Sequence, residues 1–308
     1  MMSSYKPELQ VSARNLEEVK RLAHAGADAI FVGNQQFANR QPGNFTIDQI
    51  QEATEWLHNQ GKKIYVMINA IYHNQHLELL PTYLKNLERL KVDGIVAGDQ
   101  SIYQILRDIE CSIPLTWNPE TLSTNYQTLN FWAQRGLSRA TLSNELSLDA
   151  VIKIKENVEF PIEMQVHGMT NIFHSKRKLI RNYYAQIDET YDRSKTRFIK
   201  ENRKPETHYP IFEDLNGTHI MSNEDLVMVD YLDQILDAKI DGLYIEGILK
   251  TINYNEEIVS IYREAIDMYL TDPATFETKK TAFKQMISDI QPDDRQLNTG
   301  FYFKEQIY

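Results

Sequence analysis

The chain has 308 residues, of which 42% are hydrophobic and 25% charged, and its formal net charge at pH 7 is −10. This composition is typical of a globular protein, and the negative charge argues against non-specific nucleic-acid binding by the whole surface. The single cysteine, Cys111, excludes an internal disulfide framework, a cysteine-rich zinc site and a four-cysteine iron–sulfur cluster held by this chain alone.

Two further features bound the class of protein. No apolar run reaches the roughly 20 residues that a membrane-spanning helix needs, and the polar start of the chain lacks a secretory signal pattern. We therefore expect a cytoplasmic protein. Because a typical (β/α)8 barrel has about 250 residues, the length allows one such domain with an insertion and a tail.

Short segments rich in β-branched and apolar residues recur along the chain, mostly followed by helical patterns. We expect eight strands, at 9–12, 29–32, 64–69, 95–97, 115–118, 139–143, 162–167 and 243–246. We expect helices at 15–25, 46–60, 77–90, 126–135 and 148–156, capped in three cases by Asn15, Thr46 and Ser147. This alternation predicts a parallel α/β fold, and eight strands favour a closed (β/α)8 barrel of the TIM type. An open doubly wound sheet is the alternative.

The alternation is interrupted after the seventh strand, by an insertion at 169–222. Its following helix is expected near 224–239, and the tail at 273–308 carries one more helical segment, 278–290. Because active sites of such barrels are built from the loops after the strands, we expect the insertion to lie over the C-terminal mouth. A surface elaboration without chemistry is the alternative. We expect a single domain, 1–308.

Polar residues recur on the strand faces that should point into the barrel. Side chains alternate between the two faces of a strand, and in a barrel one face looks inward. Buried carboxylates need partners or a ligand, so a polar pocket near the C-terminal ends of the strands is favoured. The predicted catalytic residues are Glu163, His167 and Glu246, and the predicted substrate-binding residues are Asn69, Asn118, Gln165 and Tyr244. For Glu163, which lies early in its strand, a structural ion-pair or hydrogen-bond anchor is the alternative.

Positive charge is concentrated in one segment of this acidic chain. Residues 174–204 hold ten Lys and Arg residues against four acidic ones. Four aromatic residues are interleaved with them, namely Tyr183, Tyr184, Tyr191 and Phe198. Such a pattern suits phosphate contacts with base stacking, so we predict RNA binding by Lys176, Arg177, Lys178 and Arg181. A solvated helical face that pairs with acidic neighbours or a partner subunit is the alternative.

Metal binding and proteolysis have weaker support. His73 and His76 follow the third strand and, with His167, are the candidate ligands for a metal at the mouth, but this spacing in a loop is a weak signal, and we predict no metal site. Cys111 lies in a helix-to-strand connection, at the end of the barrel opposite to the expected chemistry. The chain also lacks a His-Glu-x-x-His motif.

The run Glu163-Met-Gln-Val-His167-Gly168 resembles the signature of the peptidase U32, or collagenase-like, family. Further segments that resemble family motifs lie at 144–147, 209–217, 221–226, 244–250 and 299–301. In cluster-bearing members, four cysteines around the insertion bind an iron–sulfur centre. This chain has Asn171, Lys178 and Val227 at three of those positions, so the resemblance implies that it binds no such cluster.

Within the family, the chain is similar to the short, cysteine-poor partner of paired bacterial proteins for 5-hydroxyuridine synthesis in tRNA. The resemblance implies hydroxylation of the tRNA wobble uridine by a prephenate-dependent route, with prephenate as co-substrate. It also implies a longer, cysteine-bearing family protein as partner. A U32-type peptidase and a non-catalytic scaffold that positions tRNA are the alternatives.

Overall fold

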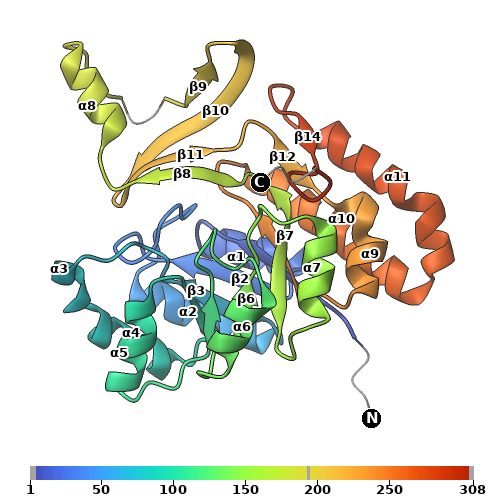
Figure 1. The fold of residues 1–308 in the computed structure, drawn as a ribbon, viewed down its shortest axis with the longest axis horizontal. Coiled ribbons are helices and arrows are strands. Elements are labelled where there is room, and N and C mark those ends of the chain that lie inside the picture. The colour runs from blue at the N-terminus through green and yellow to red at the C-terminus, as the bar shows by residue number, and fades with distance from the viewer. Residues whose placement is uncertain (1–4, 193–194, 305–308) are drawn as a thin grey trace.

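The computed structural model describes residues 5–192 and 195–304, and its centre is a closed barrel of eight parallel strands (Figure 1). The barrel strands are β1 (Glu8–Ser12), β2 (Ala29–Gly33), β3 (Lys63–Met67), β4 (Gly94–Ala97), β5 (Leu115–Trp117), β6 (Arg139–Thr141), β7 (Ile162–Gly168) and β13 (Gly242–Glu246). Consecutive strands pair in parallel, and β13 closes the barrel by pairing with both β7 and β1. The predicted TIM-type barrel is confirmed, and every predicted strand overlaps an observed one.

Most helices pack around the outside of the barrel. They are α1 (Leu16–His24), α2 (Ile47–Asn59), α3 (Asn74–Leu77), α4 (Leu80–Leu90), α5 (Gln100–Asp108), α6 (Tyr126–Ala133), α7 (Leu148–Lys155), α9 (Leu232–Asp237), α10 (Ile252–Thr271) and α11 (Pro273–Ile290). As predicted, Asn15, Thr46 and Ser147 cap α1, α2 and α7 by accepting backbone hydrogen bonds. Within the described residues, no helix is long and apolar enough to cross a membrane.

The helix predicted near 224–239 is wrong in its first half. Strand β12 (Asp225–Val227) and a 3-10 turn (Val229–Tyr231) precede α9 there. The reason is backbone pairing, because β12 bonds antiparallel to β7 and parallel to β14 (Leu297–Asn298) of the tail. A partner supplied by the distant tail therefore overrides the local helical pattern.

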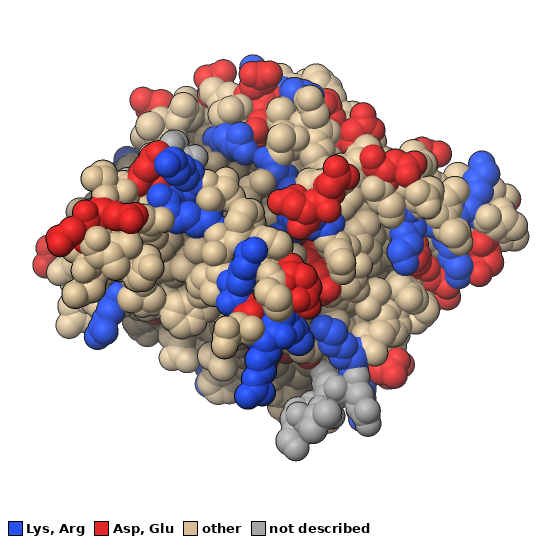
Figure 2. Space-filling view, turned by 90° about the horizontal axis from the view of Figure 1, so that it is seen from above, with Lys and Arg blue, Asp and Glu red and all other residues tan. Residues whose placement is uncertain are grey.

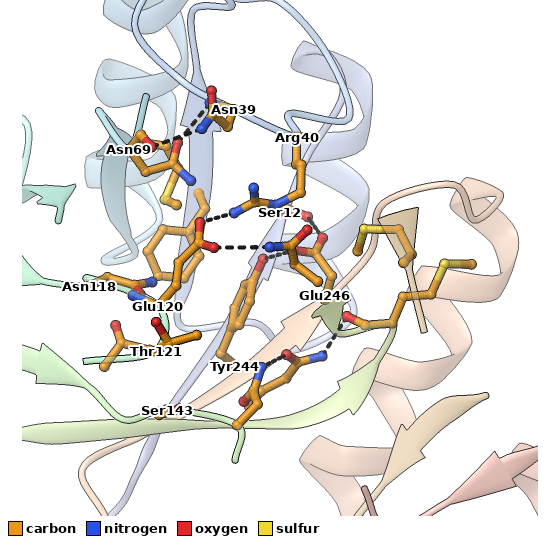
Figure 3. A pocket seen from close by; sticks show the side chains of 18 of the residues that line it. Ser12, Asn39, Arg40, Asn69, Asn118, Glu120, Thr121, Ser143, Tyr244 and Glu246 are labelled. Carbon is orange, nitrogen blue, oxygen red and sulfur yellow. Dashed lines mark hydrogen bonds and ion pairs between the residues drawn. The ribbon is translucent and has the colours of Figure 1, made fainter. Parts of the chain in front are cut away.

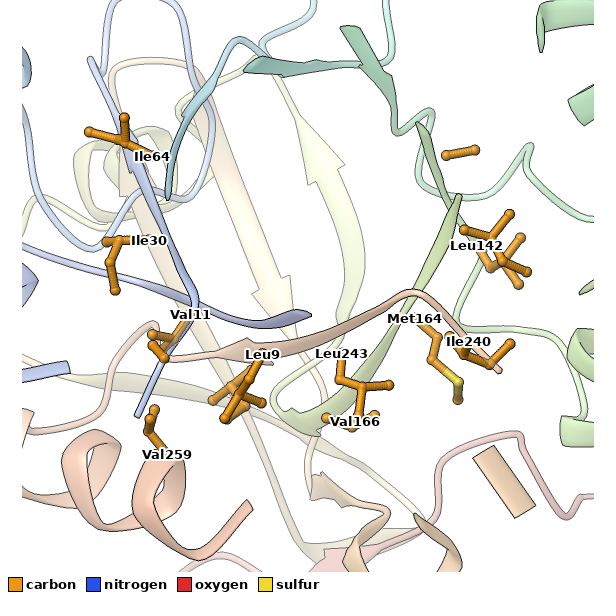
Figure 4. Close-up of a cluster of buried hydrophobic side chains, with 14 of the residues drawn as sticks. Leu9, Val11, Ile30, Ile64, Leu142, Met164, Val166, Ile240, Leu243 and Val259 are labelled. Carbon is orange, nitrogen blue, oxygen red and sulfur yellow. The ribbon is translucent and has the colours of Figure 1, made fainter. Parts of the chain in front are cut away.

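The hydrophobic core lies mainly between the barrel strands and the helices. Figure 4 shows part of it, with fully buried side chains that include Leu9, Val11, Ile30, Ile64, Met164, Val166 and Leu243. Inside the barrel, the apolar cluster is much smaller and consists of Ala29, Phe31, Tyr65 and Val96. Much of the remaining interior is polar, as expected from the strand patterns, with buried Gln10, Thr116, Thr141, Glu163 and Gln165.

The insertion after β7 forms a four-stranded antiparallel sheet over the C-terminal end of the barrel (Figure 1). Its elements, here called the cap, are β8 (Asn171–Ser175), α8 (Leu179–Gln186), β9 (Arg197–Glu201), β10 (Lys204–Asp214) and β11 (Gly217–Met221). The amide of Asn216 donates to the carbonyls of Gln35 at 2.8 Å and Ala38 at 3.0 Å, and the Asp214 carboxylate accepts from the Arg40 backbone N–H at 3.0 Å. These contacts hold the cap on the loop after β2, over the mouth as predicted.

Candidate functional site

Two contiguous cavities lie where the barrel opens beneath the cap. The inner cavity has a volume of about 120 Å³, and the outer groove between the barrel loops and the cap has about 770 Å³. Both are lined by the same ring of residues, Asn39, Asn69, Asn118, Glu120, Thr121, Asn144, Glu145 and Asn171. A ligand that passes from the groove into the inner cavity therefore meets hydrogen-bonding groups around its path.

The inner cavity contains a half-buried carboxyl group, Glu246, at the end of β13. Its oxygens accept hydrogen bonds from the Tyr244 hydroxyl at 2.7 Å, the Ser12 hydroxyl at 3.3 Å and the Ile248 backbone N–H at 2.9 Å. Burial raises the pKa of Glu246, and these donors, together with the charge of Arg40, oppose the rise only in part. A carboxyl group whose pKa is raised in this way can act as an acid or a base in proton transfer. Burial raises the pKa of Tyr244 as well, reinforced by the neighbouring Glu246.

A second polar cluster joins two barrel loops to the cap. Arg40 follows β2, Glu120 follows β5, and Asn171 is the first residue of β8. Arg40 Nη2 donates to Glu120 Oε1, and Asn171 Nδ2 donates to Glu120 Oε2 at 3.0 Å. Figure 3 shows the Arg40 side chain above Tyr244 and Glu246, with its guanidinium directed at Glu120. Arg40 and Glu120 both have positive φ, +50° and +60°, a strained backbone conformation that is frequent at functional sites.

Amide side chains supply most of the other polar surface. The Asn39 backbone N–H donates to Asn69 Oδ1 at 2.9 Å, and Glu120 N–H donates to Asn118 Oδ1 at 3.1 Å. Gln165 Oε1 accepts from Asn144 at 2.7 Å, and Gln165 Nε2 donates to two carbonyls at the end of β7. The four residues predicted from the strands to bind substrate, Asn69, Asn118, Gln165 and Tyr244, therefore all line the inner cavity.

Glu163, in contrast, lies deeper in the barrel and lines neither cavity. Its carboxylate accepts from Gln10 Nε2 at 3.0 Å, Arg139 Nη1 at 3.2 Å and the Thr141 hydroxyl at 2.6 Å. Arg139 also pairs with Glu8 at 2.6 Å. These contacts match the structural alternative for Glu163, an anchor that ties several strands together at the base of the barrel.

The prediction that His167 points into the barrel is wrong. The pairing of β7 with β13 shifts by one residue, because Tyr244 lies opposite Gln165 whereas Ile245 lies opposite His167. This β-bulge breaks the alternation of side chains. His167 points outward instead, and its Nε2 lies 2.8 Å from the Tyr254 hydroxyl of α10. Burial lowers the pKa of His167 to about 3, so the imidazole is neutral.

The basic residues predicted to bind RNA lie in the cap, outside the lining of both cavities. Lys176 Nζ donates to the Ile71 carbonyl in the loop after β3 and so connects the cap with the barrel, whereas Lys178 Nζ donates to the Asp214 carbonyl of β10, within the cap. Figure 2 looks down on this side and shows groups of Lys and Arg interrupted by Asp and Glu. Arg193, counted in the basic segment, is outside the described residues.

A metal site finds no geometric support in the part of the chain that the structure describes. No group of three or more His, Cys, Asp or Glu side chains there could hold a metal ion. His73 and His76 close a short turn instead, since the His73 backbone N–H donates to His76 Nδ1 at 3.1 Å. His167 lies against α10, so the three histidines do not converge.

Sequence reasoning missed Ser12, Arg40 and Glu120 as lining residues. A signal for the latter two was present, because they follow the second and fifth strands, where barrel active sites are built. Asn171, which the sequence marks only as a residue in the place of a cysteine, contributes an amide to the site.

Known proteins are similar to this chain over most of its length. The profile of peptidase family U32 matches residues 14–307. The chain is 40% identical over 307 residues to tRNA hydroxylation protein P2 of Bacillus subtilis (strain 168), covering 98% of this chain and 99% of that protein. It is 31% identical to tRNA hydroxylation protein P1 of the same strain, covering 98% of this chain and 74% of P1. The solved structure of the U32 peptidase Mk0906 shares the fold, with a TM-score of 0.51 at 11% identity over 80% of this chain and 94% of that one. By these matches, the chain belongs to peptidase family U32.

Proposed function

We propose that this protein takes part in the 5-hydroxylation of the wobble uridine of tRNA, by a route that uses prephenate as co-substrate. The observation that carries the proposal is the 40% identity to tRNA hydroxylation protein P2 over nearly the full length of both chains. A polar cavity at the C-terminal mouth of the barrel is consistent with it, because this is where TIM-barrel enzymes carry out their chemistry.

The proposed partner is a longer, cysteine-bearing protein of the same family. Proteins P1 and P2 occur in one strain, and the chain spans 99% of P2 but only 74% of P1. The longer relative therefore has sequence beyond the region that this chain matches. A pair of unequal family members, each with its own part in one modification, fits these lengths.

We assign the iron–sulfur cluster of the family, if the route uses one, to that partner. Asn171 and Lys178 contribute an amide and an ammonium group where cluster-bearing relatives have thiolates, and Val227 is a buried aliphatic residue. Cys111 lies between α5 and β5, on the N-terminal side of the barrel. The same position leaves cysteine-dependent proteolysis without structural support.

Among the three predicted catalytic residues, we assign proton transfer to Glu246. It lines the inner cavity, whereas Glu163 and His167 do not. Glu163 is proposed to hold the base of the barrel, and His167 to hold β7 against α10. In the cap, Lys176, Arg177, Lys178 and Arg181 are proposed to contact tRNA phosphates, which carry no base information but orient the substrate.

Nucleoside mass spectrometry of bulk tRNA tests this proposal in cells that lack the gene. Deletion should remove 5-hydroxyuridine derivatives, the native gene should restore them, and Glu246→Gln should not. Glu257→Gln, which alters an exposed carboxylate on α10, is the matched control and should restore them fully. Unchanged nucleosides in the deletion strain would refute the tRNA function.

A further inference from the structure

We propose that Arg40, Glu120 and Asn171, here called the reading triad, recognise the Watson–Crick edge of a uracil base flipped into the inner cavity. The inference rests on the proposed function and names the determinants of base recognition. Arg40 and Asn171 would contact the base, and Glu120 would position both of them.

The orientation of the triad follows from the chemistry of Glu120. An ionised carboxylate only accepts hydrogen bonds, so the amide of Asn171 must turn Nδ2 toward Glu120 and Oδ1 away from it. Arg40 likewise gives Nη2 to Glu120 and keeps Nη1 for another partner. Glu120 thus fixes which polar atoms of its two neighbours are left to a ligand.

Those two remaining atoms are buried and lack a partner among the described residues. They are Arg40 Nη1, a donor, and Asn171 Oδ1, an acceptor. Leaving a buried polar atom unsatisfied costs about 1–3 kcal/mol, so such atoms at a cavity are expected to meet a ligand or water. Both residues line the inner cavity, so a ligand in it lies against both side chains.

Uracil offers the complementary pair. Its O4 accepts a hydrogen bond, as Arg40 Nη1 requires, and the adjacent N3–H donates one, as Asn171 Oδ1 requires. Cytosine has the opposite pattern, because an amino group replaces O4 and N3 carries no proton. In the same position, the amino group of cytosine would oppose the donor Arg40 Nη1, and its unprotonated N3 would oppose the acceptor Asn171 Oδ1. The triad therefore discriminates between the two pyrimidines as flipped-base pockets do.

The dimensions and walls of the cavities suit a flipped nucleotide. The inner cavity of about 120 Å³ approaches the roughly 150 Å³ in which an apolar protein cavity binds benzene, another planar six-membered ring. Phe31, Met67 and Tyr244 provide apolar surface on its walls. The outer groove could take neighbouring nucleotides, with Phe173 and Phe301 exposed for stacking at 43% and 46%.

Charge favours a neutral ring over an anionic ligand at this place. Among the described residues that line the two cavities, Arg40 is the one Lys or Arg, and it is paired with Glu120. The acidic residues that line them are Asp99, Glu120, Glu145 and Glu246. A dicarboxylate such as prephenate would add negative charge to acidic surroundings, whereas uracil adds none.

The test compares two anticodon stem-loop RNAs that differ only in U or C at the wobble position. Binding is measured by fluorescence anisotropy with the full chain, purified together with its partner. The native protein should bind the U form about tenfold or more tightly than the C form, as expected of a bidentate contact. Asn171→Ala should reduce this ratio to about twofold or less by loss of the acceptor.

Glu120→Gln tests the positioning role, since a glutamine amide can donate as well as accept and no longer fixes the orientation of Asn171. We expect the U/C ratio to fall toward one, mainly because binding of the C form improves. Asn130→Ala is the matched control, because Asn130 lies on α6 with its amide bonded to the Asn157 carbonyl, and its ratio should stay unchanged. Melting temperatures verify that each variant is folded.

Equal binding of the two RNAs by the native protein, or an unchanged ratio in both triad variants, would overturn the inference. Displacement of the U form by added prephenate, lost in Arg40→Gln, would also overturn it by assigning the triad to a carboxylate. Nucleoside analysis of the deletion strain distinguishes a failure of the reading triad from a failure of the proposed tRNA function. If deletion removes 5-hydroxyuridine while the RNAs bind equally, only the triad is refuted.

Discussion

Replacing Arg139 by glutamine should destabilise the barrel strongly, because this side chain lies between two buried carboxylates. Arg139 Nη1 lies 2.6 Å from Glu8 Oε1 and 3.2 Å from Glu163 Oε2, and the three side chains are 13%, 10% and 3% exposed, respectively. Removing one partner of a buried ion pair leaves an uncompensated charge, which typically costs about 3–5 kcal/mol.

The pKa of Glu8 gives a second estimate of how much stability Arg139 contributes. Burial alone would raise it, but Arg139, with help from Lys63 and Gln10, lowers it from 4.5 to about 2. At about 1.4 kcal/mol per pKa unit, this difference corresponds to roughly 3 kcal/mol. Because the folded-state pKa is depressed, this stability is fully present above pH 4.5 and is lost as pH falls from 4.5 toward 2.

Thermal unfolding at a series of pH values measures the effect. At about 2 °C per kcal/mol for a chain of this size, Arg139→Gln should lower Tm by roughly 5–10 °C at neutral pH. The deficit should shrink as pH falls, first because the buried Glu8 carboxylate of the variant, without its arginine, becomes protonated above pH 4.5, and then because the native protein loses the Glu8 contribution below pH 4.5. Glu163→Gln combined with Arg139→Gln should cost less than the sum of the two single changes, since the residues are in direct contact.

Arg89→Gln is the matched control, because Arg89 is exposed on α4 and its replacement should change stability by less than about 0.5 kcal/mol. A Tm of Arg139→Gln within about 1 °C of the native value would refute the reasoning. So would a deficit that stays constant between neutral pH and pH 4, because the two carboxylates would then not be its cause.

The remaining predictions concern His167 and Tyr244. His167→Phe should lose about 1 kcal/mol at pH 7 with the Tyr254 hydrogen bond. The stability difference between the variant and the native protein should then become smaller as pH falls below 6.5, because the depressed pKa of His167 makes the native fold lose stability between pH 6.5 and about 3. Urea unfolding at several pH values measures this difference, and a difference that does not change with pH would contradict the prediction. Tyr244→Phe removes a donor to Glu246 and should raise the pKa of that carboxyl group further. If Glu246 acts as a base, the activity rises with pH as this carboxyl group loses its proton, and Tyr244→Phe should move the rising part of the pH–activity profile to higher pH. A profile that does not move would exclude Glu246 as the titrating group.

Much of the fold could be predicted from short stretches of sequence. β-branched segments such as 29–32 and 64–69 mark strands, and Thr46 and Ser147 mark helix starts, because these preferences act over a few neighbouring residues. The repeated alternation then favours a barrel. The alternation of side chains along each strand also predicts the cavity residues Asn69, Asn118, Gln165, Tyr244 and Glu246. All of them occupy inward-facing positions at or near the C-terminal ends of their strands.

The errors arose where a distant segment decides the local structure. His167 turns outward because the register of β7 against β13 contains a bulge, and β13 lies far along the chain. Strand β12 replaces the start of a predicted helix because β7 and the tail strand β14 pair with it. Neither event leaves a clear trace in the local pattern of apolar and polar residues.

By itself, the sequence determined the strand and helix periodicity, the polar character of the barrel interior and the lack of cysteines for a cluster. Only the tertiary structure decided which polar groups meet. Arg40, Glu120 and Asn171 belong to two separate loops and the cap, and they come together because barrel closure and the docked cap bring these segments to one mouth. Periodicity reports how each segment faces its immediate surroundings, whereas a binding site depends on contacts between segments that no local preference encodes.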